Sequence, residues 1–185
     1  MAENKVQYGL CNVHYAPYTI TDGVVSYGAV KAFPGAVNLS LSAEGDEYIF
    51  RADNIDYFRT NSNLGYSGTF ECARIPDEFA TAILNRTVDT NNVEFEYERN
   101  ATNPFALMFE VDGDENATKF VFYNVTVGRV GVDAQTTGED LEVQTTTLDL
   151  TARPSVDLGI VRGRTRENTD ATVLANWYTA VQLPA

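Results

Sequence analysis

Positive charge is scarce in this sequence. The 185 residues include 13 lysines and arginines against 26 aspartates and glutamates, so the formal net charge is −13. Proteins that grip nucleic acid through its phosphates need stripes of lysine and arginine, and anionic membrane surfaces attract the same residues. The composition therefore argues against both kinds of binding. It does suit a surface that DNA passes without sticking, because like charges repel.

The side chains of common catalytic and metal sites are also few. The chain has one histidine, His14, and two cysteines, Cys11 and Cys72. Residues three apart on an extended strand point to opposite faces, which argues against a Cys11–His14 nucleophile and base. No G-x-S-x-G motif occurs, and two cysteines with one histidine do not make a zinc site. We therefore expect reduced thiols, no enzymatic activity, no cofactor and no metal.

Long apolar runs are missing as well. None approaches the roughly 18–20 residues that cross a bilayer, and the first ten residues, MAENKVQYGL, lack the basic and apolar blocks of a secretory signal. We expect synthesis in a cytoplasm and no membrane partner. The apolar content of 44% is enough for a substantial core, so residues 1–185 are predicted to form a single domain.

One acidic stretch has the opening spacing of a calcium loop. Asp112, Asp114 and Asn116 occupy alternate positions in EVDGDENATKFVFY. Such a loop needs glycine at its sixth position and glutamate at its twelfth, where this chain has Ala117 and Tyr123. The Asp-Gly pair between two apolar runs instead predicts the tip of a β-hairpin. Weak cation binding by the exposed acids stays open.

Alternation of apolar and polar residues with period two dominates the chain and predicts strands. The segments that show it, or that are densely apolar between turn residues, are 36–45, 67–75, 92–98, 103–111, 118–127 and 141–154. In the last segment Leu148 and Leu150 have the opposite parity to Leu141 and Val143, which suggests a bulge or a change of buried face.

Two short helices are predicted among the strands. Residues 76–84, PDEFATAIL, place a proline and two acids in a first turn, as helix N-termini prefer. Residues 170–178, DATVLANWY, begin with an aspartate that can cap the helix. The apolar stripes of both helices are expected to pack in the core.

Residues 44–68 form an unusual segment that is rich in large apolar side chains. Two strand-like pieces, Tyr48–Ala52 and Ile55–Thr60, flank Asp53-Asn54 and are followed by a return rich in Gly, Asn and Ser. So many large apolar groups on one segment imply that it packs against something. The residues expected to do so are Tyr48, Phe50, Ile55, Tyr57, Phe58 and Tyr66.

The order of these pieces resembles the major tail protein, or tail tube protein, family of long-tailed, non-contractile bacteriophages (siphophages). The resemblance is carried by KVQYGLCNVHYA, FPGAVNLSLSAEGDE, ADNIDYF, TNSNLGYSGTFECARIPDEF, PFALMFEVDGDENATKFVFYNV, QTTTLDLTARP and WYTAVQLP, in that order. These motifs run from Lys5 to Pro184, so the resemblance spans nearly the whole chain.

The resemblance implies a mainly β tail tube fold. This is a β-sandwich or barrel-like domain with one flanking α-helix, a short C-terminal helix and a long protruding hairpin at residues 44–68. Six copies would form a hexameric ring, and self-assembly of stacked rings would build the virion tail tube that conducts DNA during ejection. The hairpin would be the arm that packs onto the neighbouring ring. The implied partners are further copies of the chain, a tape measure protein, and tail terminator or tail tip proteins.

Polar strand faces are the candidates for the lining of such a tube. Their residues are Asn38, Ser40, Ser42, Thr69, Glu71, Thr145, Thr147 and Asp149. With few positive groups among them, a lining of this kind would let DNA pass without specific binding.

Two other classes of protein fit parts of the pattern. One is a monomeric cation- or glycan-binding β-sandwich, which would not need the long aromatic segment at residues 44–68. The other is the inner tube protein of a contractile tail or injection system, which would share much of the fold. The basic cluster of Arg162, Arg164 and Arg166 is expected to meet an acidic neighbouring subunit or solvent.

Overall fold

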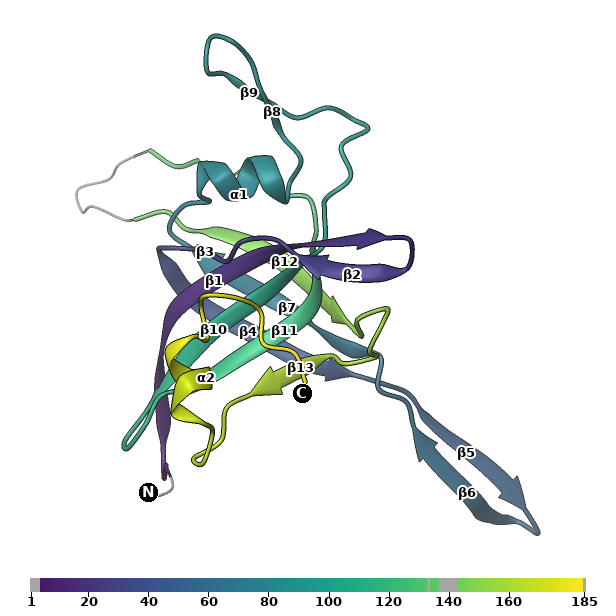
Figure 1. The fold of residues 1–185 in the computed structure, drawn as a ribbon. Coiled ribbons are helices and arrows are strands. Elements are labelled where there is room, and N and C mark those ends of the chain that lie inside the picture. The colour runs from purple at the N-terminus through teal and green to yellow at the C-terminus, as the bar shows by residue number, and fades with distance from the viewer. Residues whose placement is uncertain (1–3, 133, 137–142, 185) are drawn as a thin grey trace.

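A curled antiparallel sheet carries two short helices and two projecting hairpins (Figure 1). The computed structural model describes residues 4–132, 134–136 and 143–184. The large sheet contains β1 (Gln7–Thr21), β2 (Val24–Tyr27), β3 (Lys31–Ala32), β4 (Ala36–Glu44), β7 (Gly65–Cys72), β10 (Phe105–Gly113), β11 (Thr118–Val127), β12 (Thr146–Arg153) and β13 (Arg162–Arg164). The hairpins are β5 (Glu47–Ala52) with β6 (Ile55–Asn61), and β8 (Thr87–Val88) with β9 (Glu94–Phe95). The helices are α1 (Asp77–Ala82) and α2 (Ala171–Ala175).

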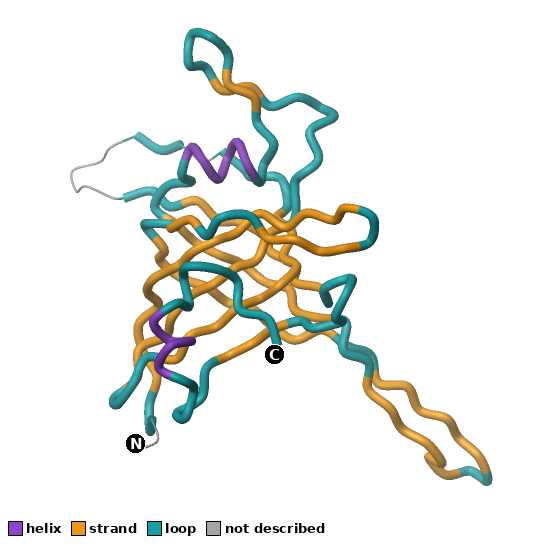
Figure 2. Tube along the Cα trace, viewed as in Figure 1, coloured by secondary structure: helices purple, strands orange, loops and turns teal. Residues whose placement is uncertain are grey.

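The large sheet folds back on itself. Its strand order is β2-β1-β10-β11-β12-β7-β4, with β3 added to β1 and β13 added to β11. After β3 the chain turns toward β4, and the Phe33 amide donates to the Val13 carbonyl at 2.7 Å. This brings the start of β4 near β1, and Figure 2 shows the strands wrapping around a common interior. The prediction of a mainly β, sandwich-like fold with two small helices is confirmed.

The main core fills the interior of this curled sheet, and α1 closes one end of it. Phe79 on α1 makes edge-to-face contacts with Tyr15, Phe33 and Phe105 at centroid distances of 4.9, 5.0 and 5.3 Å. Such aromatic pairs contribute about 0.5–1.5 kcal/mol each beyond the area they bury. The predicted apolar stripe of this helix is therefore core, as expected.

A second core lies on the outer face of β10 and β11. Met108 and Val121 are fully buried there, under Trp177 and the chain that follows α2. Both faces of β10 and β11 are thus covered, which explains why their sequences are densely apolar instead of alternating.

Asp170 caps α2 as predicted, since its side chain accepts from the Thr172 amide at 2.7 Å.

The acidic stretch is a hairpin tip, as predicted. It joins β10 to β11, which pair antiparallel from Val111 and Thr118 inward. Asn4 binds across the tip, because its side chain accepts from the Glu115 and Asn116 amides at 3.1 and 2.9 Å. These two amides of the turn are therefore bound by the chain itself.

Two strand predictions are corrected. In segment 92–98 only Glu94–Phe95 forms a strand, and it pairs with β8 outside the large sheet. In segment 141–154 the strand begins at Thr146; Leu141 lies outside the described residues, and Val143 is exposed before the strand starts. The parity change in the sequence thus marks the beginning of a strand and not a bulge within one.

Cys11 and His14 lie on the same face of β1, so the prediction that they point to opposite faces is wrong. The register of β1 on β10 shifts between these residues, so that Cys11 lies opposite Glu110 and His14 opposite Met108. Glu110 and Met108 are two apart and share a face, which places Cys11 and His14 on that same face. Asn12, with φ of 50°, is the residue that accommodates the shift.

Candidate assembly surfaces

The structure brings the predicted lining residues together on one face. Three cross-strand rows run over β4, β7 and β12. The rows are Asn38–Glu71–Thr147, Ser40–Thr69–Asp149 and Ser42–Ser67–Thr151. The alternate rows point into the core and include Leu39–Phe70–Leu148. Period-two alternation thus separates a core face from a polar face across three neighbouring strands.

The polar face carries acidic and neutral groups. Thr145, just before β12, donates from its hydroxyl to the carboxylate of Glu71, so this predicted lining residue also joins the face. Asp149 is exposed in the central row. At the end nearest the β5–β6 hairpin, Arg153 is paired with Glu44 at 3.1 Å, which offsets its charge. The net charge of the face is therefore negative.

β4 leaves one edge of the large sheet open. It pairs with β7 along residues 36–44, and the described part of the chain provides no strand for its other edge. Unpaired amides and carbonyls on a long edge strand are a template for a strand of another molecule.

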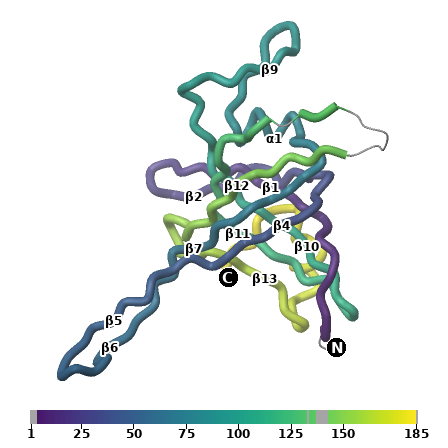
Figure 3. Tube along the Cα trace, turned by 180° about the vertical axis from the view of Figure 1, so that it is seen from behind, coloured from purple at the N-terminus to yellow at the C-terminus, as the bar shows by residue number. Residues whose placement is uncertain are grey.

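The β5–β6 hairpin, which we call the arm, prolongs the β4–β7 pair away from the sheet (Figure 3). Its base is tied by the Leu64 amide, which donates to the Glu44 carbonyl at 2.9 Å. At its tip Asp53 and Asn54 both have positive φ, 52° and 63°, as the two-residue turns of hairpins require. The arm is therefore a two-stranded ribbon.

The two faces of the arm differ in chemistry. Phe50 pairs with Phe58, while Arg51 pairs with Asp56 after a register shift. Because successive residues alternate faces, Phe50 and Phe58 share one face and the charged pair takes the other. On the charged face Arg51 and Arg59 contact Asp56 at 2.8 and 2.6 Å. The charged face is satisfied internally, and the aromatic face is not covered.

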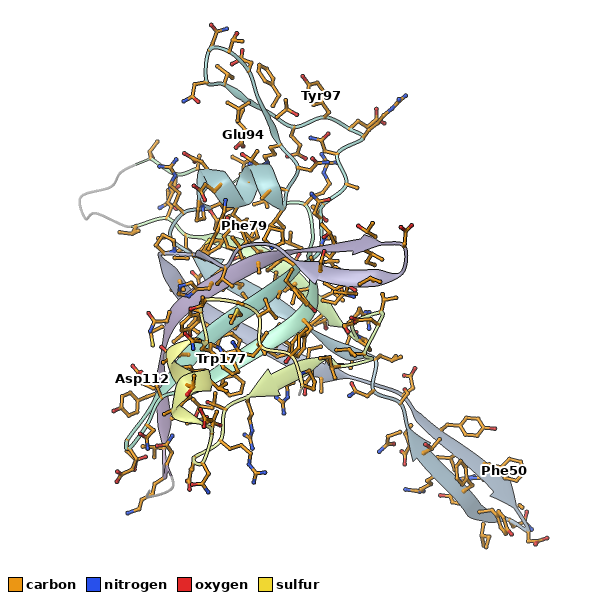
Figure 4. All side chains as sticks on the ribbon, in the orientation of Figure 1. Phe50, Phe79, Glu94, Tyr97, Asp112 and Trp177 are labelled. Carbon is orange, nitrogen blue, oxygen red and sulfur yellow. The ribbon has the colours of Figure 1, made fainter. Side chains whose placement is uncertain are left out.

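Most of the predicted arm residues are exposed in the monomer. The exposed fractions are 60% for Tyr48, 50% for Phe50, 60% for Ile55, 69% for Tyr57 and 54% for Phe58. Large apolar groups gathered on a projecting ribbon mark an interaction surface. Figure 4 shows Phe50 well away from the body of the protein.

Tyr66 is not part of this ribbon, which corrects its assignment to the arm. It lies on β7, half-buried, with its ring 5.3 Å from Phe122 and with Arg162 stacked over it at 5.3 Å. The projecting segment therefore spans residues 47–61 instead of the whole of 44–68.

A second projection was not foreseen from the sequence. Residues 86–99, which we call the excursion, leave the fold after α1 and contain β8 and β9. Arg86 contacts Glu94 at 2.7 Å, and Arg129 contacts Glu96 at 2.6 Å. The first ion pair lies within the excursion, and the second ties Glu96 to the body of the protein. The alternate positions Val93, Phe95 and Tyr97 remain 48, 42 and 56% exposed.

The two thiols and the histidine each contact other groups of the fold. Burial, followed by the nearby Asp112 carboxylate, raises the pKa of Cys11, and burial raises the pKa of Cys72. Both shifts keep the thiols protonated, whereas a nucleophile needs the thiolate. His14 is stacked on Tyr178 at a centroid distance of 4.1 Å, so its ring serves packing.

A buried ion pair holds the C-terminal segment on the sheet. Lys119 Nζ lies 3.0 Å from Glu110 and donates to the Leu174 carbonyl at 3.2 Å. It also lies 5.1 Å from the centroid of the Tyr178 ring. Burial, with Glu110 as the next cause, raises the pKa of Tyr178. No signal in the sequence distinguished Glu110 and Lys119 from surface charges.

The basic cluster is divided between two environments. Arg162 covers Tyr66, whereas Arg164 and Arg166 line a groove of about 1000 Å³ together with Asn4 and Lys119.

Within residues 4–132, 134–136 and 143–184 no group of three or more His, Cys, Asp or Glu side chains could hold a metal ion. Over the same residues no helix is long and apolar enough to cross a membrane.

The similarity of this chain to known proteins is structural. No protein-family model and no curated protein matches the chain. Among solved structures the chain is similar to the anti-feeding prophage cap, the AFP tube terminating cap, seen by cryo-EM. The TM-score is 0.46 at 12% identity, over 89% of this chain and 95% of that one. A similarity at this level assigns neither a fold family nor a function.

Proposed function

We propose that this chain is a structural protein of a phage tail, which forms hexameric rings that stack into the tube through which DNA is delivered. The observation that carries the proposal is the set of three polar rows on β4, β7 and β12, in register and backed by core residues. The order of motifs along the chain, which resembles siphophage tail tube proteins, supports it independently.

The polar rows suit the lining of a DNA channel. Glu71 and Asp149 are acidic, and Arg153 at the end of the face is paired with Glu44. Such a wall repels phosphates and offers DNA few binding groups. DNA would then pass without specific binding.

The open edge of β4 suits closure into a ring. Exposed edges lead to open-ended association unless the geometry closes them. Head-to-tail pairing of edges around a symmetric ring uses every edge and continues the polar face around a common barrel. The partner strand comes from the neighbouring copy in this arrangement.

The arm supplies the contact between rings. Within the part of the chain that the structure describes, Tyr48, Phe50 and Phe58 belong to neither core cluster, and each is at least half exposed. Replacing residues 47–61 by a short Gly-Ser turn should leave the large sheet folded and the rings intact but prevent stacking. Tyr66 must be kept in this variant, because it packs on Phe122 in the sheet.

The remaining parts of the proposal follow from a tail role. The protein has no enzymatic activity and no cofactor, and it resides in the virion tail after synthesis in the cytoplasm of a bacterial host. Its partners besides its own copies are a tape measure protein and tail terminator or tail tip proteins.

Negative-stain electron microscopy of the purified protein, alone and with other tail components, tests the proposal. Rings or tubes with a central channel are the expected result. A protein that remains monomeric under all of these conditions would refute it.

A further inference from the structure

The aromatic face of the arm needs a surface to cover it, and the same chain offers one. The excursion presents Val93, Phe95 and Tyr97, each more than 40% exposed, on a short ribbon. The rings of Phe95 and Tyr97 lie 6.5 Å apart, which makes a continuous aromatic surface. Both surfaces are uncovered in the monomer.

The two surfaces lie at opposite ends of the molecule. The excursion rises beyond α1 at one end of the curled sheet, and the arm leaves the other end (Figures 1 and 3). One copy therefore cannot join its own arm to its own excursion. Two copies stacked in the same orientation bring the arm of one to the excursion end of the next.

The charged groups behind the two surfaces are paired within the chain. On the arm, Arg51 and Arg59 contact Asp56 on the face opposite Phe50. On the excursion, Arg86 and Arg129 contact Glu94 and Glu96, which alternate with Phe95. Contact between two copies through the aromatic faces therefore leaves these ion pairs in place, which limits repulsion in a chain with a net charge of −13.

We propose that the excursion is the docking surface for the arm of a second copy of this chain, with Phe50 and Phe58 of the arm packing on Phe95 and Tyr97. The contact joins two different surfaces, so it is heterologous and repeats along a stack. The ion pairs of Arg86 with Glu94 and of Arg129 with Glu96 hold the acidic positions, so the aromatic positions between and after them stay exposed for this docking. This inference rests on the proposed tube function and names the partner surface of the arm.

A charge placed in the surface tests the contact. Phe95→Asp combined with Tyr97→Asp should leave the circular dichroism and the rings unchanged and lower the fraction of stacked rings by about tenfold or more, because buried aromatic anchors dominate interfaces. Val24→Asp is the control, since Val24 is 67% exposed on β2 and belongs to neither the arm nor the excursion. The control should stack normally.

Disulfide formation between two samples tests which residues meet. Phe50→Cys and Phe95→Cys are prepared separately, each with Cys11→Ser, because Cys11 is the cysteine that is not buried. Mild oxidation of mixed assemblies should give a disulfide dimer that neither sample gives alone.

The outcomes separate the inference from the function on which it rests. If wild-type protein stacks and the Phe95→Asp, Tyr97→Asp variant stacks equally, the docking surface is wrong while the tube function stands. If the Phe50→Cys sample alone gives the dimer, the arms contact each other instead, and the inference is overturned. If wild-type protein forms no rings under any condition, both are overturned.

Discussion

Removing the ammonium group of Lys119 tests how the C-terminal segment is held on the sheet. In Lys119→Met the aliphatic stem is retained, but Glu110 loses the partner that lies 3.0 Å away. Only 8% of the Glu110 side chain is exposed, so water replaces the lost partner poorly. The Leu174 carbonyl loses its donor as well, and Asn12 remains as the hydrogen-bond donor to Glu110.

The structure sets the size of the expected effect. Removing one partner of a buried ion pair costs about 3–5 kcal/mol. Because 18% of the Lys119 side chain is exposed and Asn12 still donates, we expect the low end, about 3 kcal/mol of unfolding free energy. In a chain of this size that corresponds to a fall in Tm of about 6–12 °C.

Urea denaturation followed by two signals measures this effect. Fluorescence of Trp177, the single tryptophan, reports the covered outer face, and far-UV circular dichroism reports the sheet. Lys31→Met is the matched control, because Lys31 also lies 3.0 Å from a glutamate, Glu78, but the two side chains are 41 and 71% exposed. An exposed pair of this kind contributes about 0–1 kcal/mol.

Two results would refute the reasoning. The first is a Lys119→Met variant no less stable than Lys31→Met. The second is a double variant, Lys119→Met with Glu110→Gln, that is no more stable than Lys119→Met alone, since removing the unpaired charge should recover part of the loss.

Three further predictions concern the sheet, the core and the polar face. Gly68→Ala would place its Cβ 1.8 Å from a backbone oxygen of β4, so urea titration should show a loss of about 3 kcal/mol or more in unfolding free energy. Gly131→Ala is the control, because no atom lies within 4 Å of the added Cβ and the stability should hardly change. Equal stabilities of the two variants would contradict the strand spacing. Burial raises the pKa of Tyr15 to about 12, so the unfolded state ionises first and stability falls as pH rises from about 10 toward 12. Tyr15→Phe should remove part of that fall, and an unchanged pH profile of the urea midpoint would argue against it. Glu71→Lys with Asp149→Lys should make assembled protein retain DNA in cosedimentation at low salt and release it at high salt, and equal retention by wild-type protein would contradict the proposed lining.

Alternation predicted the polar rows because each strand involved has one face on the core. Ser40 and Leu39 are neighbours in sequence but lie on opposite faces of β4, because successive side chains of a strand alternate between its faces. The same alternation holds on β7 and β12. Which strands are neighbours depends on long-range pairing, which alternation does not specify. The residues of the polar face could therefore be predicted, while their arrangement in rows could not.

The failures have equally specific causes. In segment 92–98 the acidic positions form ion pairs with Arg86 and Arg129, whereas the apolar positions do not pack in the core. The alternation of this segment therefore does not mark a strand of the large sheet. Tyr66 and Tyr57 both lie in the aromatic-rich segment, so the sequence does not distinguish them. Tyr66 is half-buried because β7 pairs within the large sheet, whereas Tyr57 is exposed on the arm. The shift at Asn12 places Cys11 and His14 on one face, which simple counting along a strand cannot foresee.

The placement of the arm and the excursion at opposite ends of the sheet gives any stack built from this contact a direction. One terminal ring would present free arms, and the other would present free excursions. The two ends would therefore be chemically different and could grow at different rates. A partner that starts the stack and a partner that stops it would have to recognise different surfaces, so neither could replace the other.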